Sequence, residues 1–223
     1  TAYEIRLSLV GSEMCIRDSH VESLEIRCNP APIPSITGLA TPGTVTPLLG
    51  ESVSYTFQFV NSSGTDTGFS PFLDVAVDTS GPDGATSNPL DGFGTPTLTA
   101  GGMTLPPVGT INLSAGQTTF NHPFTGQVRP VPAGFGAGDT IFVYQAPFGS
   151  FTPGQFTEVN MTLPTSNLAD VGTPLPLVVT PGFRDDNATA PFNPIYGSNF
   201  ATNAIPELWR LTKTYLGPED ETA

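Results

Sequence analysis

The chain has 223 residues with 24 glycines, 24 prolines and 15 phenylalanines, and its 20 acidic and 7 basic residues give a formal net charge of -13. This charge excludes nucleic acids and anionic membranes as electrostatic partners, because both require a basic face. Glycine and proline stay just below the share typical of disorder, and the 38% hydrophobic content is enough for one sizeable core. No apolar run approaches the roughly 20 residues that a membrane-spanning helix needs.

Residues 1–19 resemble the translation of a sequencing-library adapter. They lack the basic start, apolar middle and small-residue cleavage site of a secretory signal peptide. Residues 1–5 and 8–19 match the fixed codons of a transposon-tagged adapter, and the two residues between them fall at its index positions. We therefore expect this segment to be non-biological and the chain to be a metagenomic fragment. Without it Cys28 is the single cysteine, so no intrachain disulfide is expected.

Residues 20–34 are interpreted as the end of a preceding domain and a linker. The apolar residues of 20–28 alternate only partly, and the pattern stops at Asn29-Pro30. Residues 30–34 (PAPIP) have the composition of a stiff extended linker.

A regular strand pattern begins after residue 50. Residues 52–60 (SVSYTFQFV) and 72–78 (FLDVAVD) alternate with a period of two and are rich in β-formers, which favours half-buried strands and excludes helix. In the second strand Asp74, Ala76 and Asp78 are expected to face outward. Further strands are predicted at residues 108–113, 117–128, 139–145, 157–163 and 175–180. The residues expected to carry the core are Val53, Tyr55, Phe57, Leu73, Val75, Ile141 and Val143.

Turn residues separate these strands. Residues 79–107 are rich in glycine and proline and are predicted to be a long loop with room for one short hairpin. Turns are also expected at residues 61–64, 115–116, 132–138, 147–154 and 181–182. Several short strands, frequent turns and no helical periodicity indicate an all-β sandwich or barrel, which we assign to residues 35–186.

The strand pattern is lost and then resumes near the C-terminus. Residues 187–205 are predicted to be a linker, and residues 206–223 the truncated first strand of a following domain. Trp209, Leu211 and Tyr215 would share one face of that strand. A short helix that begins at Pro206 is the alternative.

Two short motifs carry a family resemblance. Residues 50–56 (GESVSYT) with Asn61, and residues 211–214 (LTKT), resemble the second-strand and first-strand motifs of the conserved repeat domain of unknown function in bacterial adhesin-like proteins. The chain departs from that pattern by its 79–107 insertion and by lacking a lysine in the first strand. The resemblance implies an Ig-like antiparallel β-sandwich at the cell surface or outside the cell, with neighbouring repeats of the same chain as partners.

The resemblance also raises the question of a covalent cross-link, because some relatives form a Lys–Asn isopeptide bond beside a buried carboxylate. Lys213 is the single lysine of the chain and lies beyond the predicted domain. A self-contained isopeptide bond within residues 35–185 is therefore excluded, and Lys213 is expected to be an exposed strand residue.

Acidic residues make calcium the one cofactor to consider. The candidate ligands are Asp74, Asp78, Asp83, Asp185 and Asp186. Calcium requires six to eight oxygen ligands around one point, and the chain contains no D-x-[DN]-x-[DN]-G spacing. We expect these acids to be solvated on loops and outer strand faces, with no cofactor bound.

Catalytic residues are not expected. His122 is the single histidine inside the predicted domain, which excludes two-histidine metal sites and most zinc sites, and no G-x-S-x-G motif occurs. Glu51 and Glu158 are expected at the surface of strands. A possible sugar-binding platform consists of Phe135, Tyr144, Phe148, Phe151 and Phe156, although Tyr144 and Phe156 are expected in the core.

These observations favour a structural spacer repeat of a large extracellular, adhesin-like bacterial protein. The alternative is a calcium- or carbohydrate-binding β-sandwich module, which includes an accessory domain of a hydrolase. Neither hypothesis involves nucleic acid or membrane insertion.

Overall fold

The computed structural model describes residues 31–38, 45–81, 91–184 and 194–210 and two short strands nearer the N-terminus. These strands, β1 (Cys15–Ile16) and β2 (Arg27–Cys28), pair antiparallel with Cys15 opposite Cys28. The first of them lies in the segment that resembles an adapter. The interpretation of residues 1–34 stays a prediction.

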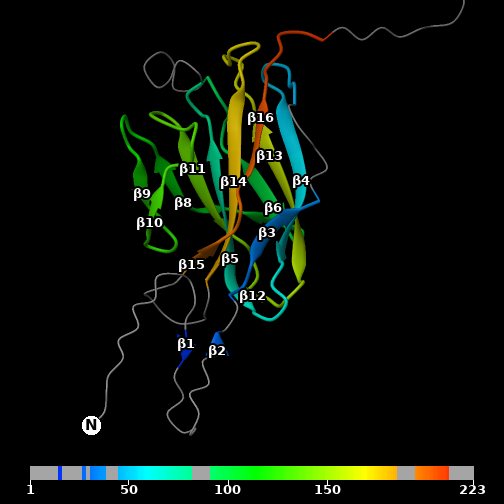
Figure 1. The fold of residues 1–223 in the computed structure, drawn as a ribbon. Helices are drawn as coiled ribbons and strands as arrows, with labels where there is room; N and C mark the ends of the chain where they lie inside the picture. The colour runs from blue at the N-terminus through cyan, green and yellow to red at the C-terminus, as the bar shows by residue number, and fades with distance from the viewer. Residues whose placement is uncertain are drawn as a thin grey trace, which may run out of the picture.

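Two antiparallel sheets pack face to face and form an Ig-like β-sandwich, as the sequence predicts (Figure 1). The five-stranded sheet contains, in spatial order, β3 (Pro34–Thr37), β4 (Ser52–Asn61), β13 (Phe156–Pro164), β6 (Thr97–Ala100) and β7 (Met103–Leu105). The seven-stranded sheet contains β15 (Pro194–Tyr196), β14 (Leu175–Arg184), β5 (Gly68–Val77), β11 (Thr140–Gln145) and β8 (Pro107–Asn112), with β12 (Ser150–Phe151) on β5 and β16 (Phe200–Ala204) on β14. The described residues contain no helix, and therefore no helix that could cross a membrane.

The predicted core residues are all buried between or within the sheets. Strand β4 alternates between exposed or half-buried and buried side chains along its length, which is the expected result of its period-two sequence. Aromatic rings close one part of the core, where Phe59 stacks on Phe183 at a centroid distance of 5.1 Å and meets Phe151 edge-on at 5.4 Å.

The predicted outward face of β5 is not exposed, and this expectation was wrong. Asp74, Ala76 and Asp78 are 5%, 2% and 6% exposed. A hairpin made of β9 (Thr119–Asn121) and β10 (Val128–Pro130) lies beside this sheet (Figure 1). We call residues 114–138, which contain the hairpin and its flanking loops, the flap. The flap adds a third layer, which a single strand's alternation cannot reveal.

A second, smaller core forms beneath the flap. Its buried residues are Ala76, Leu113, Phe120, Ile141 and Val178, with Ile111, Val131 and Phe135 packed against them. The flap also corrects the predicted strand over residues 117–128. Pro123 has no backbone N–H to donate to a ladder, and the chain turns between β9 and β10 instead.

Two further predictions need correction. The turn predicted at residues 181–182 is part of β14, where Gly182 pairs with Phe72. A Cβ atom at Gly182 would lie 2.2 Å from the Phe72 ring, so the glycine permits a close approach and does not mark a turn. The loop predicted at residues 79–107 contains the expected hairpin, β6–β7, but β6 also pairs with β13 as an integral strand.

The predicted linker over residues 187–205 is wrong for its second half, because β15 and β16 both pair with β14. Apolar residues alternate only weakly in these two short strands. The strands are therefore recognised by their backbone pairing with β14 and not by a sequence pattern. The strand predicted within residues 206–223 lies mostly outside the described residues. Residues 206–210 form no named strand, and an isolated parallel bridge pairs Glu207 with Leu48.

Candidate functional site

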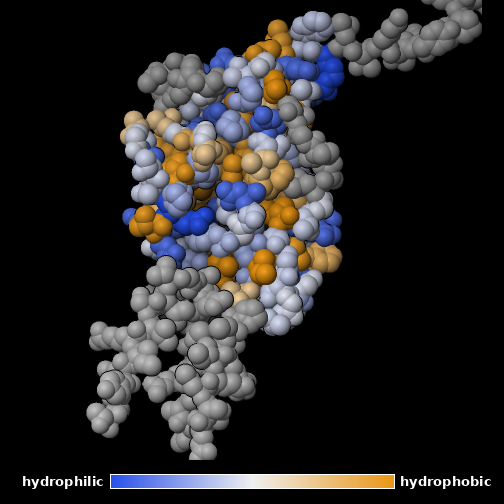
Figure 2. All heavy atoms as spheres, in the orientation of Figure 1, coloured by the Kyte–Doolittle hydropathy of each residue, from blue (hydrophilic) through white to orange (hydrophobic). Residues whose placement is uncertain are grey.

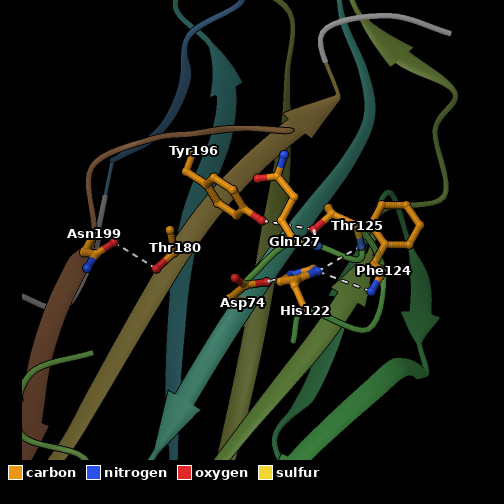
Figure 3. Close-up of polar contacts among 8 residues, drawn as sticks. All are labelled: Asp74, His122, Phe124, Thr125, Gln127, Thr180, Tyr196 and Asn199. Atoms are coloured by element: carbon orange, nitrogen blue, oxygen red, sulfur yellow. Dashed lines mark hydrogen bonds and ion pairs between the residues drawn. The ribbon is translucent and has the colours of Figure 1, made fainter. Parts of the chain in front are cut away.

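A buried polar cluster lies between β5 and the flap (Figure 3). Asp74 sits in the middle of β5, opposite Val143 of β11 and Thr180 of β14. His122 follows β9 in the flap and is 1% exposed. Its Nε2 atom lies 2.8 Å from Oδ1 of Asp74, so the pair links the flap to the seven-stranded sheet.

The hydrogen bonds of His122 define its tautomer. Its Nδ1 atom accepts the backbone N–H groups of Phe124, at 3.2 Å, and of Thr125, at 3.0 Å. Nδ1 therefore carries no proton, and Nε2–H donates to the Asp74 carboxylate. Both ring nitrogens are occupied, so the imidazole has no free nitrogen with which to act as a general base. The pair holds the turn of the flap in place.

Aromatic side chains enclose this pair. The ring of Phe72 meets the imidazole at a centroid distance of 5.3 Å, and Tyr196 of β15 meets it at 6.1 Å. The guanidinium of Arg129 lies 3.3 Å from the centroid of the Tyr196 ring, in cation–π geometry. The Tyr196 hydroxyl lies 3.3 Å from Oγ1 of Thr125, and burial raises the pKa of Tyr196. These contacts join the flap to β15.

A neighbouring polar contact ties β14 to the turn between β15 and β16. Thr180 is buried, and its hydroxyl donates to Oδ1 of the exposed Asn199 at 2.8 Å (Figure 3). This bond satisfies a hydroxyl that burial would otherwise leave without a partner.

A second buried polar cluster surrounds two carboxylates, Asp78 and Asp139, at the end of β5. Oδ1 of Asp78 accepts the N–H of Gly81 at 2.7 Å. Asp139 accepts the N–H of Gly136 at 2.8 Å and the hydroxyl of Ser80 at 3.1 Å. Burial, with a further contribution from the negative charge of Asp139, raises the pKa of Asp78 to about 7.

The five calcium candidates do not come together within the described residues. Asp74 binds His122, and Asp78 lies beside Asp139. Asp83, Asp185 and Asp186 lie outside the described residues. Within residues 31–38, 45–81, 91–184 and 194–210, no three histidine, cysteine or acidic side chains form a group that could hold a metal ion. The expectation that Asp74 and Asp78 are solvated acids is wrong, because the flap covers β5.

The proposed aromatic platform does not form as one surface. Tyr144 and Phe151 are fully buried, and Phe135 packs against the second core. Phe148 packs against the main core. Phe156, which was expected in the core, is 54% exposed at the start of β13. The five rings therefore lie in different parts of the sandwich and do not share one surface.

Two shallow grooves lie on the described surface. One, of about 380 Å³, is lined by Ser35, Ile36, Thr37, Ser62, Ser198, Asn199 and Phe200. The other, of about 400 Å³, is lined by Pro106, Val108, Gln145, Ala146, Pro147, Phe148 and Gly149. No charged side chain lines either groove. They therefore lack the carboxylates that calcium binding requires.

Several residues of the buried clusters were missed by sequence reasoning. The sequence pattern predicts Asp139 as the first residue of a strand, and it indicates no role for Tyr196 or Thr180. The one available signal was Asp74, a charged residue inside the apolar run 72–77. A charge in such a run requires a buried partner, and His122 was the single histidine of the domain.

Comparison with known proteins gives similarity of fold only. No protein-family model and no curated protein sequence matches the chain. The chain is similar to AvmM, which catalyses macrocyclization in alchivemycin A biosynthesis, with 14% identity, a TM-score of 0.48, and 84% of this chain and 94% of that chain covered. It is similar to the seventh ScaB type I cohesin from Pseudobacteroides cellulosolvens, with 11% identity, a TM-score of 0.35 and coverages of 78% and 95%.

A third similar structure is BcpA, the major pilin subunit of Bacillus cereus. It shares 8% identity at a TM-score of 0.34, with 88% of this chain and 48% of that chain covered. At these identities and TM-scores, none of the three similarities carries an argument about function.

Proposed function

We propose that this chain is a structural spacer module of an extracellular bacterial protein. The observation that carries the proposal is the course of the chain. The segment ahead of β3 enters at one end of the sandwich, and the segment after β16 leaves at the opposite end (Figure 1). Modules joined through such ends extend in line, and each adds the length of its sandwich to the distance between its neighbours.

The polar groups inside the domain support a structural role. Asp74 and His122 use their hydrogen-bonding atoms to hold the flap on the sheet, and Asp78 and Asp139 join two loops. Hydrogen bonds between buried groups of separate segments make a fold more rigid and more specific. A rigid module suits a spacer, because its length does not depend on a bound ligand.

The surface also fits repeated modules in series. Hydrophobic and hydrophilic residues are interspersed on the face shown in Figure 2. The net charge of -13 makes copies of the chain repel one another, which opposes association between modules. Leu208 and Trp209, each 65% exposed, follow the last strand at the place where a further module would attach.

A thermal melt of the purified chain tests this proposal against a calcium- or carbohydrate-binding module. The melt is recorded with calcium, with EDTA, and with a panel of soluble glycans. A spacer should unfold cooperatively as a monomer at one temperature under all these conditions. A rise of several degrees with calcium or with one glycan would overturn the spacer proposal, because a ligand that binds the native state stabilises it.

A second test concerns the neighbours. The parent gene should encode further Ig-like modules on one or both sides of this chain. A parent gene in which this domain stands beside a catalytic domain alone would favour an accessory module of an enzyme.

A further inference from the structure

Two segments far apart in the sequence lie side by side where the chain leaves the domain. Residues 45–49 run parallel to residues 203–207, the end of β16 and its continuation. The bridged pairs are Val45 with Ala204 and Leu48 with Glu207. We call these two segments the terminal pair. It is a parallel contact in a domain whose named strands all pair antiparallel.

Four backbone hydrogen bonds hold the terminal pair together. They run from Val45 N to Asn203 O (3.4 Å), Ile205 N to Val45 O (2.8 Å), Glu207 N to Pro47 O (2.8 Å) and Leu49 N to Glu207 O (3.1 Å). Two donors belong to each segment, so the bonds are spread along its length. The guanidinium of Arg210 adds a bond to the carbonyl of Thr46.

Both segments are anchored to the body of the sandwich. Val45 and Leu49 pack against the main core, and Ala204 is fully buried within it. Strand β16 also pairs with β14 over five residues. Neither segment can therefore move without breaking contacts to the main core.

The direction of the two segments determines how tension would act on them. The segment ahead of β3 enters at one end of the sandwich, and the chain after β16 leaves at the opposite end (Figure 1). Tension between the ends pulls on the first residue of one segment and on the last residue of the other. In a parallel pair these pulls oppose each other along the strand axis, so all four hydrogen bonds are loaded together.

We propose that the terminal pair is a shear clamp that resists unfolding when the module is stretched through its two ends. This inference rests on the proposed spacer function, since only a module within a longer chain is pulled in this way. Strand β3 lies ahead of the clamp on the same path. The terminal pair bears the load once the four register pairs of β3 with β4, and the bond from Ile33 N to Asn61 Oδ1, have broken.

Constant-force unfolding of the full chain, tethered through its two termini, tests the clamp. The variant Ile205→Pro removes the N–H that donates to Val45 O. The matched control is Val131→Pro, which removes a bond of similar length in the flap, 2.9 Å to Thr118 O. Both residues are half-buried and both precede a proline, so the substitutions are equivalent locally.

Ile205→Pro should raise the unfolding rate under force about fivefold, the effect of losing one net backbone hydrogen bond from the barrier. Val131→Pro should leave that rate unchanged, although both variants lower the midpoint of urea unfolding. Glu207→Pro, which removes the bond to Pro47 O, should raise the unfolding rate under force by a similar factor. It provides a second clamp variant if Ile205→Pro does not fold. Equal rates under force for the clamp variants and the flap control would overturn the clamp.

The same molecules separate this outcome from failure of the spacer proposal. The melt with calcium, EDTA and glycans depends on ligand binding and not on the terminal pair. If no ligand shifts the melt, and the flap control unfolds under force as fast as Ile205→Pro, the spacer proposal stands and the clamp is overturned.

Discussion

Asn61 illustrates how one side chain connects three separate segments. It is fully buried at the end of β4. Its Nδ2 group donates to the carbonyls of Asp66, at 2.7 Å, and Phe151, at 3.0 Å. Its Oδ1 atom accepts the N–H groups of Ile33, at 3.2 Å, and Ser63, at 3.1 Å. The asparagine of the repeat-like motif is thus a structural junction, and all four of its hydrogen-bonding positions are used.

The variant Asn61→Asp should therefore destabilise the domain by about 2–4 kcal/mol, because a carboxylate cannot donate to two buried carbonyls. Urea unfolding measures the loss. Asn160→Ala is the control, since Asn160 is exposed on β13 and its side chain bonds the side chains of Thr56 and Glu158 at the surface. It should cost no more than about 0.5 kcal/mol. Similar losses in both variants would contradict the junction role of Asn61.

Asp78 should make the domain less stable as the pH rises. Its pKa is about 7 in the folded chain against an ordinary value of 3.8, so the folded state holds more protons between these values. The contribution of Asp78 to the free energy of unfolding therefore falls as the pH rises from about 4 to 7, and it levels off above pH 7. The cause is the burial of a second negative charge beside Asp139.

Asp78→Asn should remove this slope, because an amide still accepts the Gly81 N–H without a charge. At pH 8 the variant should be more stable than the parent, by up to about 4 kcal/mol, and the difference should shrink toward pH 4. Thermal melts of both proteins at pH 4, 5.5 and 8 give the comparison. Parallel pH profiles would show that Asp78 carries no such shift.

At the scale of elements, the flap depends on one turn. His122 accepts two backbone N–H groups through Nδ1 and donates to Asp74, while its own backbone bonds Gln127 and Gly126 across the turn. The turn therefore depends on Nδ1 as the acceptor of both N–H groups.

His122→Ala should open the flap without unfolding the sandwich, because the main core between the sheets does not include the flap. Hydrogen exchange should show that the Phe124 and Thr125 amides lose protection while the β4–β13 ladder keeps it. Thr118→Ala, a change at an exposed residue of the same flap, should leave both unchanged. Equal loss of protection in β4 and the flap would mean that the two layers unfold as one unit.

At the scale of the whole molecule, the alternation of apolar and polar residues was sufficient to predict the strands that bury one face. Strands β4 and β13 lie within one residue of their predicted bounds, and Val53, Tyr55 and Phe57 face the core as expected. The period of two reports burial on one side of a strand, and these strands have one such side. It does not report which other strand lies next to them.

Three features could not be derived in this way. The flap covers β5 only through contacts between residues distant in sequence, such as Asp74 with His122. Strands β15 and β16 have no regular alternation and exist because β14 offers them a free edge. The terminal pair joins residues more than 150 positions apart, and its backbone bonds do not depend on side-chain identity.

The sequence by itself determined the all-β class, the main core, the acidic character and the absence of a self-contained Lys–Asn bond, since these follow from residue type and local periodicity. Only the tertiary structure decided the burial of Asp74 and Asp78, the engagement of both nitrogens of His122, and the positions of the segments before β3 and after β16 at opposite ends of the sandwich. These depend on which segments meet across the fold. Backbone hydrogen bonds and layer packing set those meetings, and neither is encoded in the spacing of residues along one strand.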